Sequence, residues 1–359
     1  MTASPGQDRP LRVLVVTGAY PSEQRPHSGT FIKSQVDALV EAGIEVEVIH
    51  PDPALSTPRR YAWAIMQVVR KSLSGHYDII HGHYSFWCAV ARLQWTTPVV
   101  ASYLGDDVLG TIGADGTYTA KSRYVRAFSR LLAYLVDAVI VKSEQMKKVL
   151  GGPQEKVFVI PNGINFEQFR PLPRDEIRAL LGWNQQRYYV VFANNPAIPV
   201  KNFKLAQATI ERLQARGIEA ELIVANGLPH AKVVEYMNAS NALILTSIAE
   251  GSPNVVKEAM ACNVPVVSTD VGDVADVIGR TEGCSVCPPD PEALADGLEK
   301  ALRHVERTTG RNDIQHLKSS FVAQRVINVY KKILGVPVDE GAADNHQSHT
   351  KEAVYVKGP

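Results

Sequence analysis

The sequence predicts an α/β protein with two domains, each built on a parallel sheet flanked by helices. Short apolar runs alternate with longer amphipathic segments, which is the pattern of repeated βαβ units. The alternation occurs twice and is interrupted by a turn-rich and proline-rich stretch, NGINFEQFRPLP, at residues 162–173. Such a stretch is typical of a domain boundary. A chain of 359 residues is also long enough for two domains of ordinary size.

The first half contains the run Leu11–Thr17, which is apolar without interruption and ends at a glycine, as in a strand buried on both faces. Further strands are expected at Val46–His50, Ile79–His81, Pro98–Ser102, Ala138–Lys142 and Val157–Ile160. Helices are expected between them, at Phe31–Ala42, Tyr61–Leu73, Ala120–Leu135 and Glu144–Leu150.

The second half repeats the alternation and ends in one long helix. Its strands are expected at Tyr188–Ala193, Ala220–Ala225, Ala242–Thr246, Val264–Ser268 and Gly283–Val286. Its helices are expected at Phe203–Ala215, Ala231–Asn238, Pro253–Ala261, Pro291–His304 and Ile314–Leu334. We therefore predict a first domain over 1–165, a second over 172–310, a terminal helix over 311–335 and a mobile tail over 336–359.

Composition excludes several classes of function. A net charge of +1, without basic residues interleaved with aromatic ones, gives no basis for binding nucleic acid. The longest apolar runs are strand-sized, and the first ten residues lack a basic start followed by an apolar stretch, so we expect neither a membrane span nor a signal peptide. Four cysteines are too few for a disulfide framework. We therefore expect a cytoplasmic protein.

The most informative segment is EGSPNVVKEAMACNVPVVSTDVG, residues 250–272. Glu250 and Glu258 lie eight residues apart around a Gly-Ser-Pro turn. Ser252 is a good N-cap and Pro253 suits the first helical position, so a helix is expected to start there. The free amides at such a helix start favour an anion. The pattern therefore predicts a ligand with phosphate in its middle and hydroxyl groups at both ends, such as a nucleotide-sugar.

This segment resembles the donor-site motif E-x7-E of retaining glycosyltransferases of family 4. The flanking positions agree with that motif as well; they are Gly251, Pro253, Ala259, Pro265, Val266, Val267 and Gly272. The resemblance implies the GT-B fold, in which two Rossmann-like domains face a cleft that holds the donor. It extends over nearly the whole chain to about Leu334, and it is strongest in the second domain.

The resemblance assigns roles on the donor side. Glu250 would bind the donor sugar and support positive charge at its anomeric carbon, Glu258 would bind the ribose hydroxyls, and Lys201 would neutralise the leaving diphosphate. Asn195 lies at or near the position of the family's phosphate-binding Arg. The remaining donor-binding residues implied are Gly29 in the glycine loop after the first strand, and Gly251, Ser252, Pro253, Asn254 and Val255, with backbone amides for the sugar and phosphate.

On the acceptor side, the segment VVASYLGDDV resembles a family segment that ends in His-Gly-x-Asp-Val. Asp107 keeps the Asp and belongs to the predicted catalytic set with Glu250 and Lys201, whereas Leu104 stands where the family has its His, or Tyr103 or Ser102 under a shifted alignment. Asp106 and Tyr103 are further acceptor-side candidates. His83, in the strand end His81-Gly-His83, is expected in the cleft and His81 in the core. No third ligand accompanies this histidine pair, so no metal is expected.

Basic residues gather on two predicted helices of the first domain, 58–74 and 119–136. The second carries Arg123, Arg126 and Arg130 on one side and apolar residues on the other. An apolar face packed on the sheet, with the arginines in solvent, is the simpler interpretation. The alternative is peripheral contact with the inner face of a membrane, or with a lipid-linked acceptor.

Together these observations predict a retaining, metal-independent glycosyltransferase without cofactor, which moves a sugar from a UDP- or GDP-sugar to a hydroxyl acceptor. A cell-envelope glycan precursor or a small-molecule glycoside would fit as the acceptor. Two alternatives remain. One is another GT-B enzyme, such as a phosphorylase or a nucleotide-sugar 2-epimerase, and the other is a non-catalytic nucleotide-sugar binder.

Overall fold

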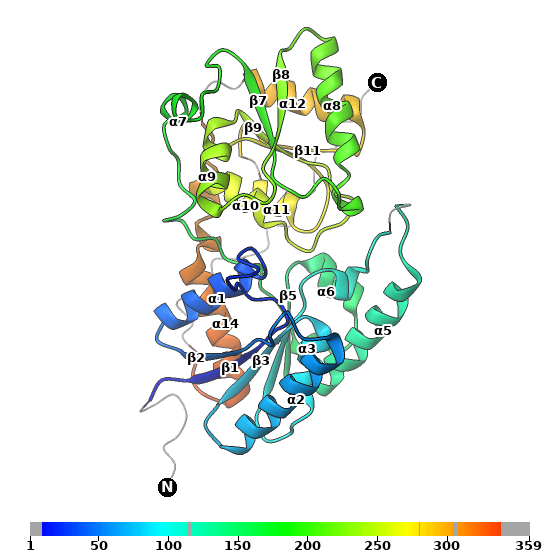
Figure 1. Ribbon diagram of the computed structural model, residues 1–359, viewed down its shortest axis with the longest axis vertical. Coiled ribbons are helices and arrows are strands. Elements are labelled where there is room, and N and C mark those ends of the chain that lie inside the picture. Colours follow the sequence, from blue (N-terminus) through cyan, green and yellow to red (C-terminus); the bar gives the residue numbers. More distant parts are fainter. Residues whose placement is uncertain (1–8, 114–115, 280, 304–306, 339–359) are drawn as a thin grey trace.

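The computed structural model describes residues 9–338 except 114–115, 280 and 304–306. Two α/β domains are arranged along the long axis, the first below and the second above in Figure 1. The predicted pair of Rossmann-like domains is confirmed, because each domain is built on an all-parallel sheet with helices between its strands. The predicted mobile tail lies, from residue 339 onward, outside the described residues.

The first sheet has six strands in the order β2-β1-β3-β4-β5-β6. Its register places Val13 of β1 beside Val46 of β2 and Ile79 of β3. The strands are β1 Arg12–Val16, β2 Glu45–Ile49, β3 Ile79–His83, β4 Val99–Ser102, β5 Ala138–Val141 and β6 Val157–Val159. The helices are α1 Thr30–Glu41, α2 Thr57–Leu73, α3 Ser85–Arg92, α4 Asp106–Leu109, α5 Ala120–Leu135 and α6 Glu144–Leu150. Of these, α3 and α4 were not predicted.

The second sheet has five strands in the order β11-β10-β9-β7-β8. The strands are β7 Tyr188–Phe192, β8 Ala220–Val224, β9 Ala242–Leu245, β10 Val266–Thr269 and β11 Ser285–Cys287. The helices are α7 Arg174–Leu181, α8 Phe203–Ala215, α9 His230–Ala239, α10 Asn254–Ala261, α11 Val274–Ile278 and α12 Pro291–Arg303. A short 3-10 helix, Pro199–Lys201, precedes α8. The helix α7 lies directly after the predicted boundary and, like α11, was not predicted.

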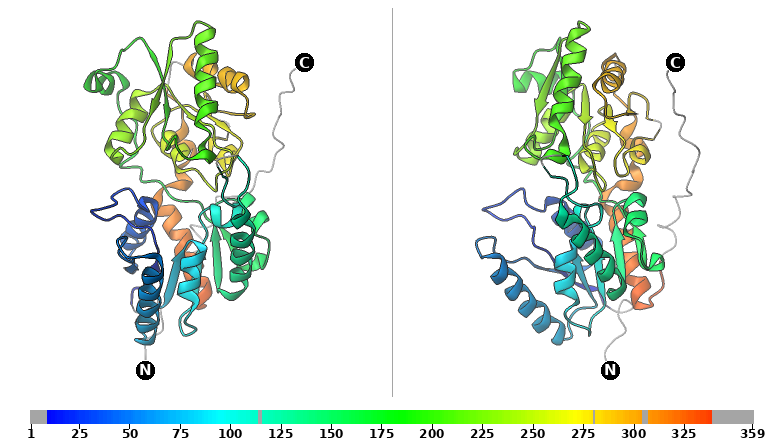
Figure 2. Two further views of the ribbon diagram at one scale, coloured as in Figure 1. Left: turned by 45° about the vertical axis from the view of Figure 1, so that its right-hand side comes forward. Right: turned by 90° about the vertical axis from the view of Figure 1, so that its right-hand side faces the viewer.

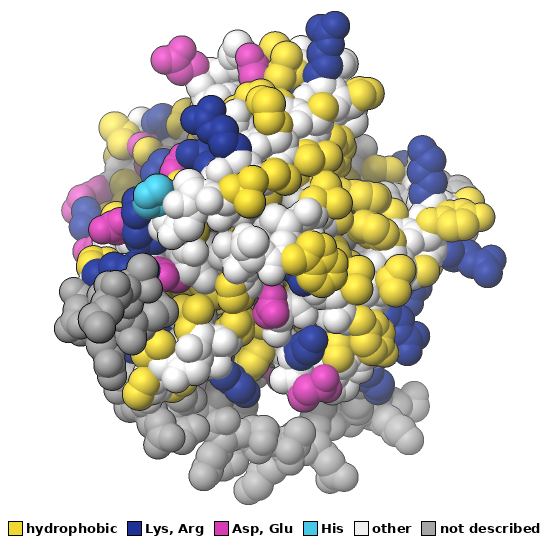
Figure 3. All heavy atoms as spheres, turned by 90° about the horizontal axis from the view of Figure 1, so that it is seen from below, with side chains coloured by type: hydrophobic (Ala, Val, Ile, Leu, Met, Phe, Trp, Pro, Cys, Tyr) yellow, Lys and Arg dark blue, Asp and Glu magenta, His cyan; other side chains and the backbone are white. Residues whose placement is uncertain are grey.

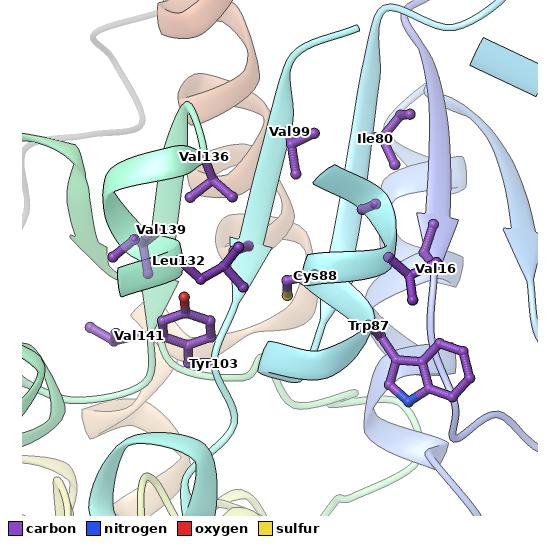
Figure 4. Close-up of a cluster of buried hydrophobic side chains, with 14 of the residues drawn as sticks. Val16, Ile80, Trp87, Cys88, Val99, Tyr103, Leu132, Val136, Val139 and Val141 are labelled. Carbon is purple, nitrogen blue, oxygen red and sulfur yellow. The ribbon is translucent and has the colours of Figure 1, made fainter. Parts of the chain in front are cut away.

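Alternate residues of each first-domain strand face two separate apolar cores. One core, drawn in Figure 4, lies between the sheet and α2, α3 and α5, and it contains Val99, Ala101 and Tyr103. The other core contains Val100 and lies between the sheet and α1 and α14 (Ser319–Leu334). Both faces of β1, β4 and β5 are buried, which explains why these strands are mostly apolar in sequence, whereas the edge strand β2 keeps two exposed glutamates.

The chain crosses between the domains twice at one place. Ile164 on the outward path accepts a hydrogen bond from the backbone of Ser319 and donates one to the carbonyl of Leu317 on the return path. After the crossing, α14 runs along the first domain and packs against α1 (Figure 2). One predicted helix over Ile314–Leu334 was therefore wrong at its start, because residues at the crossing pair with Ile164 instead of continuing a helix.

Candidate functional site

The two domains meet where the loop after β4 contacts the turn after β9. A methyl group on Gly251 would lie 3.0 Å from the carbonyl oxygen of Leu104 and 2.9 Å from the sulfur of Met146. Only glycine fits this contact. Ligands of parallel α/β sheets bind beyond the carboxyl ends of the strands. The Gly-Ser-Pro turn thus lies where the carboxyl ends of two sheets come together.

Glu250 is held by residues of its own domain. Its Oε1 accepts hydrogen bonds from Lys201 Nζ at 2.6 Å and from Ser247 Oγ at 2.7 Å. The side chains of Glu250 and Lys201 are 14% and 20% exposed, so the pair is partly shielded but open to a ligand. The structure therefore brings together two of the predicted catalytic residues, which lie 49 positions apart in the sequence.

Asp106 of the first domain faces this ion pair. Burial raises the pKa of its carboxyl group and the negative charge of Glu250 raises it further, while Lys201 opposes the shift. Interactions of this kind need charges close to one another. Lys201 and Glu250 of the second domain therefore lie close to Asp106 of the first domain, where the two domains meet.

The helix α10 starts differently from the prediction. It begins at Asn254 with Pro253 at the N-cap, and Ser252 does not cap it. Instead the Ser252 hydroxyl donates to Asp273 Oδ2 and accepts from Lys257 Nζ, both at 2.5 Å. The physical reason is that Lys257 is fully buried and needs partners. It finds them in Ser252 and in the backbone carbonyl of Asn162 at 3.2 Å.

Glu258 lines a cavity of about 310 Å³ between the domains. Burial raises the pKa of its carboxyl group to about 7, and the neighbouring Lys257 partly opposes the shift. Asn254 lines the same cavity, so these two residues of α10 face one space. The other lining residues come from the loop after β1, from α1, from the crossing segment and from His230 and Ser319; among them are Pro21, Thr30, Lys33, Gly163 and Asn165.

Two further donor-side predictions fall in loops that border the cleft. Gly29 ends the loop after β1 with φ of 65°, and a methyl group there would lie 2.2 Å from the carbonyl oxygen of Ala19. Gly29 therefore folds the loop back on itself at the start of α1. The side chain of Asn195 accepts a hydrogen bond from the backbone of Ala197 at 2.9 Å and shapes the loop before Lys201.

Two predictions for the acceptor side need correction. The ring of Tyr103 is fully buried in the core shown in Figure 4, and its hydroxyl donates to the carbonyl of Ser129 at 2.8 Å. Asp107 is also fully buried, and its carboxylate accepts hydrogen bonds from the backbone N–H groups of Ser85, Leu104 and Gly105. Neither side chain reaches the cleft. They hold the loop that carries Asp106.

The two histidines have different surroundings, and both are buried. His81 is bonded through Nδ1 to the Tyr330 hydroxyl at 2.6 Å and through Nε2 to Ser102 at 2.7 Å. Burial lowers its pKa to about 3. His83 lines a second cavity of about 310 Å³ in the first domain, together with Leu104. Burial and the charges of His81 and Lys142 also lower the pKa of His83 well below its usual range.

The sequence did not single out the buried lysines. Lys142, at the end of β5, is buried, and its pKa is lowered to about 7 by burial and by the positive charge of Lys257. The signal for Lys257 that the sequence offers is a lysine close to Val255, Val256 and Ala259, the apolar residues of α10. Within the described residues, no group of three or more His, Cys, Asp or Glu side chains could hold one metal ion.

Comparisons with known proteins agree with this geometry. Residues 7–168 match the family model "Glycosyltransferase Family 4", and residues 200–310 match "Glycosyl transferases group 1". A putative teichuronic acid biosynthesis glycosyltransferase of Bacillus subtilis is 27% identical over 81% of this chain and 89% of its own length. A D-inositol 3-phosphate glycosyltransferase of Paenarthrobacter aurescens is 24% identical over 80% and 88%.

Solved structures show the same fold. Sucrose-phosphate synthase from Thermosynechococcus elongatus superposes with a TM-score of 0.72 at 17% identity, covering 91% of this chain and all of the other. Anabaena Alr3699/HepE in complex with UDP and glucose gives 0.64 at 15% identity, covering 88% and 98%. These structures show that the chain has the GT-B fold. Because family models match both of its halves, the chain is a glycosyltransferase of the family 4 type.

Proposed function

We propose that the protein transfers a sugar from a nucleotide-diphospho-sugar to a hydroxyl acceptor with retention of the anomeric configuration. The observation that carries this proposal is the cluster of Glu250, Lys201 and Asp106 at the turn where the domains meet. The cavity that holds Glu258 adds a place for the nucleoside next to it.

Glu258, Lys201 and Glu250 would each bind a different part of the donor. Glu258 would accept hydrogen bonds from the ribose hydroxyls, and Lys201 would offset the charge of the leaving diphosphate, aided by the backbone N–H groups of Gly251, Ser252, Asn254 and Val255. Glu250 would bind the sugar hydroxyls and support positive charge at the anomeric carbon. Catalysis of this kind comes from positioning and electrostatics rather than from a covalent intermediate.

The bond changes then balance without a protein nucleophile. The bond from the anomeric carbon to the β-phosphate oxygen breaks, and the acceptor oxygen forms a new bond on the same face. The acceptor proton passes to the released β-phosphate. Because Lys201 and backbone amides supply the electrostatic stabilisation, we propose that no metal ion is needed.

The names of two relatives support a proposal for the acceptor class. They are a protein of teichuronic acid biosynthesis and an inositol-phosphate glycosyltransferase. Both names point to hydroxyl acceptors that carry or join negatively charged groups. We propose an acceptor of this chemistry, destined for a cell-envelope glycan or a small glycoside.

A thermal-shift screen of the full chain over UDP-, GDP- and ADP-sugars tests the donor, since a ligand bound to the folded state raises the melting temperature. NMR of the product with the stabilising donor then gives the anomeric configuration. We expect retention, and Glu250→Ala should abolish transfer while exposed Glu219→Ala should not. Inversion, or turnover that requires inorganic phosphate, would refute the proposal.

We also propose that the first domain contacts an anionic membrane surface through α5. Within the described part of the chain, no helix is long and apolar enough to cross a membrane. One side of α5 packs on the core of the first domain through Leu132 and Ala133, as the simpler interpretation had it, but this packing does not cover all of its apolar residues. Four of its large apolar residues are exposed, from 46% to 79%, namely Tyr124, Leu131, Tyr134 and Leu135.

The exposed face continues beyond α5. Arg92 donates to the carbonyl of Leu135 at 2.6 Å and stacks on the ring of Trp95, which is 69% exposed. The helix contains four Lys or Arg residues and no acidic residue. Figure 3 shows hydrophobic and basic side chains next to one another on the right, the side on which α5 lies in Figure 1. Apolar side chains beside cations are typical of peripheral binding to anionic lipids.

Sedimentation with vesicles tests this contact. We expect binding to vesicles that contain phosphatidylglycerol, little binding to pure phosphatidylcholine, and loss of binding in Leu131→Glu. Leu180→Glu on α7 is a matched control, because Leu180 is 69% exposed on the other domain. Equal binding of both vesicle types, or a dimer in solution that Leu131→Glu dissociates, would refute the membrane contact.

A further inference from the structure

The cavity of the first domain is lined by residues that have no role in the proposed binding of the donor. It is bordered by the loop after β1, the start of α2 and the start of α3; its lining comprises Thr17, Gly18, Ala19, Ile32, Thr57, Arg60, Tyr61, His83, Tyr84, Trp87 and Leu104. Arg60 is the one side chain with a permanent charge in this lining, and no carboxylate is among these residues. The cavity therefore carries a positive charge that no acid of its own lining balances.

Arg60 is held in place by one hydrogen bond, but not all of its N–H donors have partners. Its Nη2 donates to the carbonyl of Gly18 at 2.9 Å, which fixes the guanidinium against the loop after β1. Its Nε is buried and has no hydrogen-bond partner in the described structure. The guanidinium group has five N–H donors in a planar fork that suits carboxylate and phosphate oxygens. A buried donor without a partner is costly unless a ligand satisfies it.

His83 supplies a second, independent sign of a ligand. It is 1% exposed, lines the same cavity, and its Nδ1 has no partner among the described residues. Its imidazole is neutral at pH 7, because burial and two neighbouring groups lower its pKa well below the usual range. A neutral imidazole can donate or accept a hydrogen bond with a hydroxyl group.

The walls between these two polar groups are aromatic. Tyr61 and Trp87 are stacked with ring centroids 4.6 Å apart, and the Arg60 guanidinium lies 5.9 Å from the centre of the Trp87 ring. Leu104 borders the cavity and, through its carbonyl, also approaches Gly251 of the second domain. The cavity thus extends from a cation at Arg60 toward the turn next to Glu250.

From this arrangement we infer that the cavity binds the acceptor, and that the acceptor carries a phosphate or carboxylate group which pairs with Arg60 while a ring hydroxyl bonds His83. This inference rests on the proposed transferase function for the direction of the reaction. The anion preference itself rests only on the lining of the cavity, so it can be measured without any donor. Arg60 then selects the acceptor and takes no part in bond breaking.

Isothermal titration of the full chain with glucose 6-phosphate, glucuronate and glucose tests the inference. We expect at least one of the two anions to bind about tenfold or more tightly than glucose. The phosphate and carboxylate arms show which anion the site favours. The preference should disappear in Arg60→Met and remain in Arg59→Met, a matched control because Arg59 is its exposed neighbour on the same helix turn.

The variant Arg60→Lys distinguishes the effect of the positive charge from that of the guanidinium geometry. It should keep part of the anion preference because lysine is also positively charged, and lose the rest because lysine lacks the planar fork. A melting temperature within a few degrees of the parent shows that each variant is folded. If glucose binds as tightly as both anions, if neither anion binds, or if Arg60→Met keeps the preference, the inference is wrong. Anion preference without transfer from any nucleotide-sugar would instead refute the proposed function alone.

Discussion

The two sides of the cleft use polar residues in different ways. On the second-domain side, Glu250, Lys201 and Glu258 keep their charged groups at the cleft or in its cavity. On the first-domain side, Tyr103 and Asp107 turn inward and satisfy backbone groups. A charged residue beside a ligand-sized space serves binding, whereas one whose oxygens are all taken by backbone donors serves the fold.

The difference has a geometric origin. The helix α10 fixes the direction of the Glu258 side chain, and hydrogen bonds from Lys201 and Ser247 fix that of Glu250 in the turn before the helix. After β4 the alternation of the strand continues for one residue, and Tyr103 therefore joins Val99 and Ala101 on the buried face. Asp107 then turns back on the loop instead of facing the second domain.

Lys201→Ala gives the largest expected effect on the donor side. Loss of the cation that faces the diphosphate should lower kcat by roughly 10²–10³-fold, the usual result of removing one electrostatic contact to a developing charge. Steady-state kinetics with the donor found in the screen measure it. Lys204→Ala, three residues later and exposed on α8, is the control. Equal losses in both variants would mean that Lys201 has no special role.

The variant Asp107→Ala tests whether Asp107, on the first-domain side, stabilises the fold instead of taking part in the reaction. Three backbone N–H groups lose their acceptor, at about 1 kcal/mol each, so the free energy of unfolding should fall by about 3 kcal/mol. Urea denaturation measures it. Asp106→Ala should leave that free energy nearly unchanged, because within the described residues no backbone N–H group donates to its carboxylate, and should lower turnover instead. A stable but inactive Asp107→Ala variant would return Asp107 to the catalytic set.

Glu258 predicts a pH dependence of donor binding. Burial holds the pKa of its carboxyl group at about 7 in the free protein, so the acceptor form of the group increases as the pH rises from 6 to 8. Nucleotide affinity should therefore rise about tenfold at most over this range, since one unit of pH changes the ionised fraction by up to that factor. Titrations at several pH values measure it. Glu258→Gln should flatten the profile, and an unchanged slope in that variant would assign the titration to another group.

Much of the fold followed from the sequence because the strands lie in parallel sheets whose central strands are buried on both faces. The predicted start of the last helix was wrong because tertiary contacts determine where it begins. At the crossing between the domains, Leu317 and Ser319 form backbone hydrogen bonds with Ile164. In the site, spacing predicted Glu250 and Glu258. It could not predict that Ser252 would bond Lys257 and Asp273, because that choice depends on a lysine buried by packing.

The smallest effect is expected where α14 meets the first sheet. Tyr330→Phe removes the hydroxyl that bonds His81 Nδ1 and should cost about 1 kcal/mol of stability, the net worth of one buried hydrogen bond. Turnover should stay the same, because His81 faces the core although its neighbour His83 lines a cavity. Tyr134→Phe, on the exposed side of α5, should change neither quantity. A fall in turnover without a loss of stability in Tyr330→Phe would mean that His81 acts on the reaction through His83, and the division between the two histidines would then be wrong.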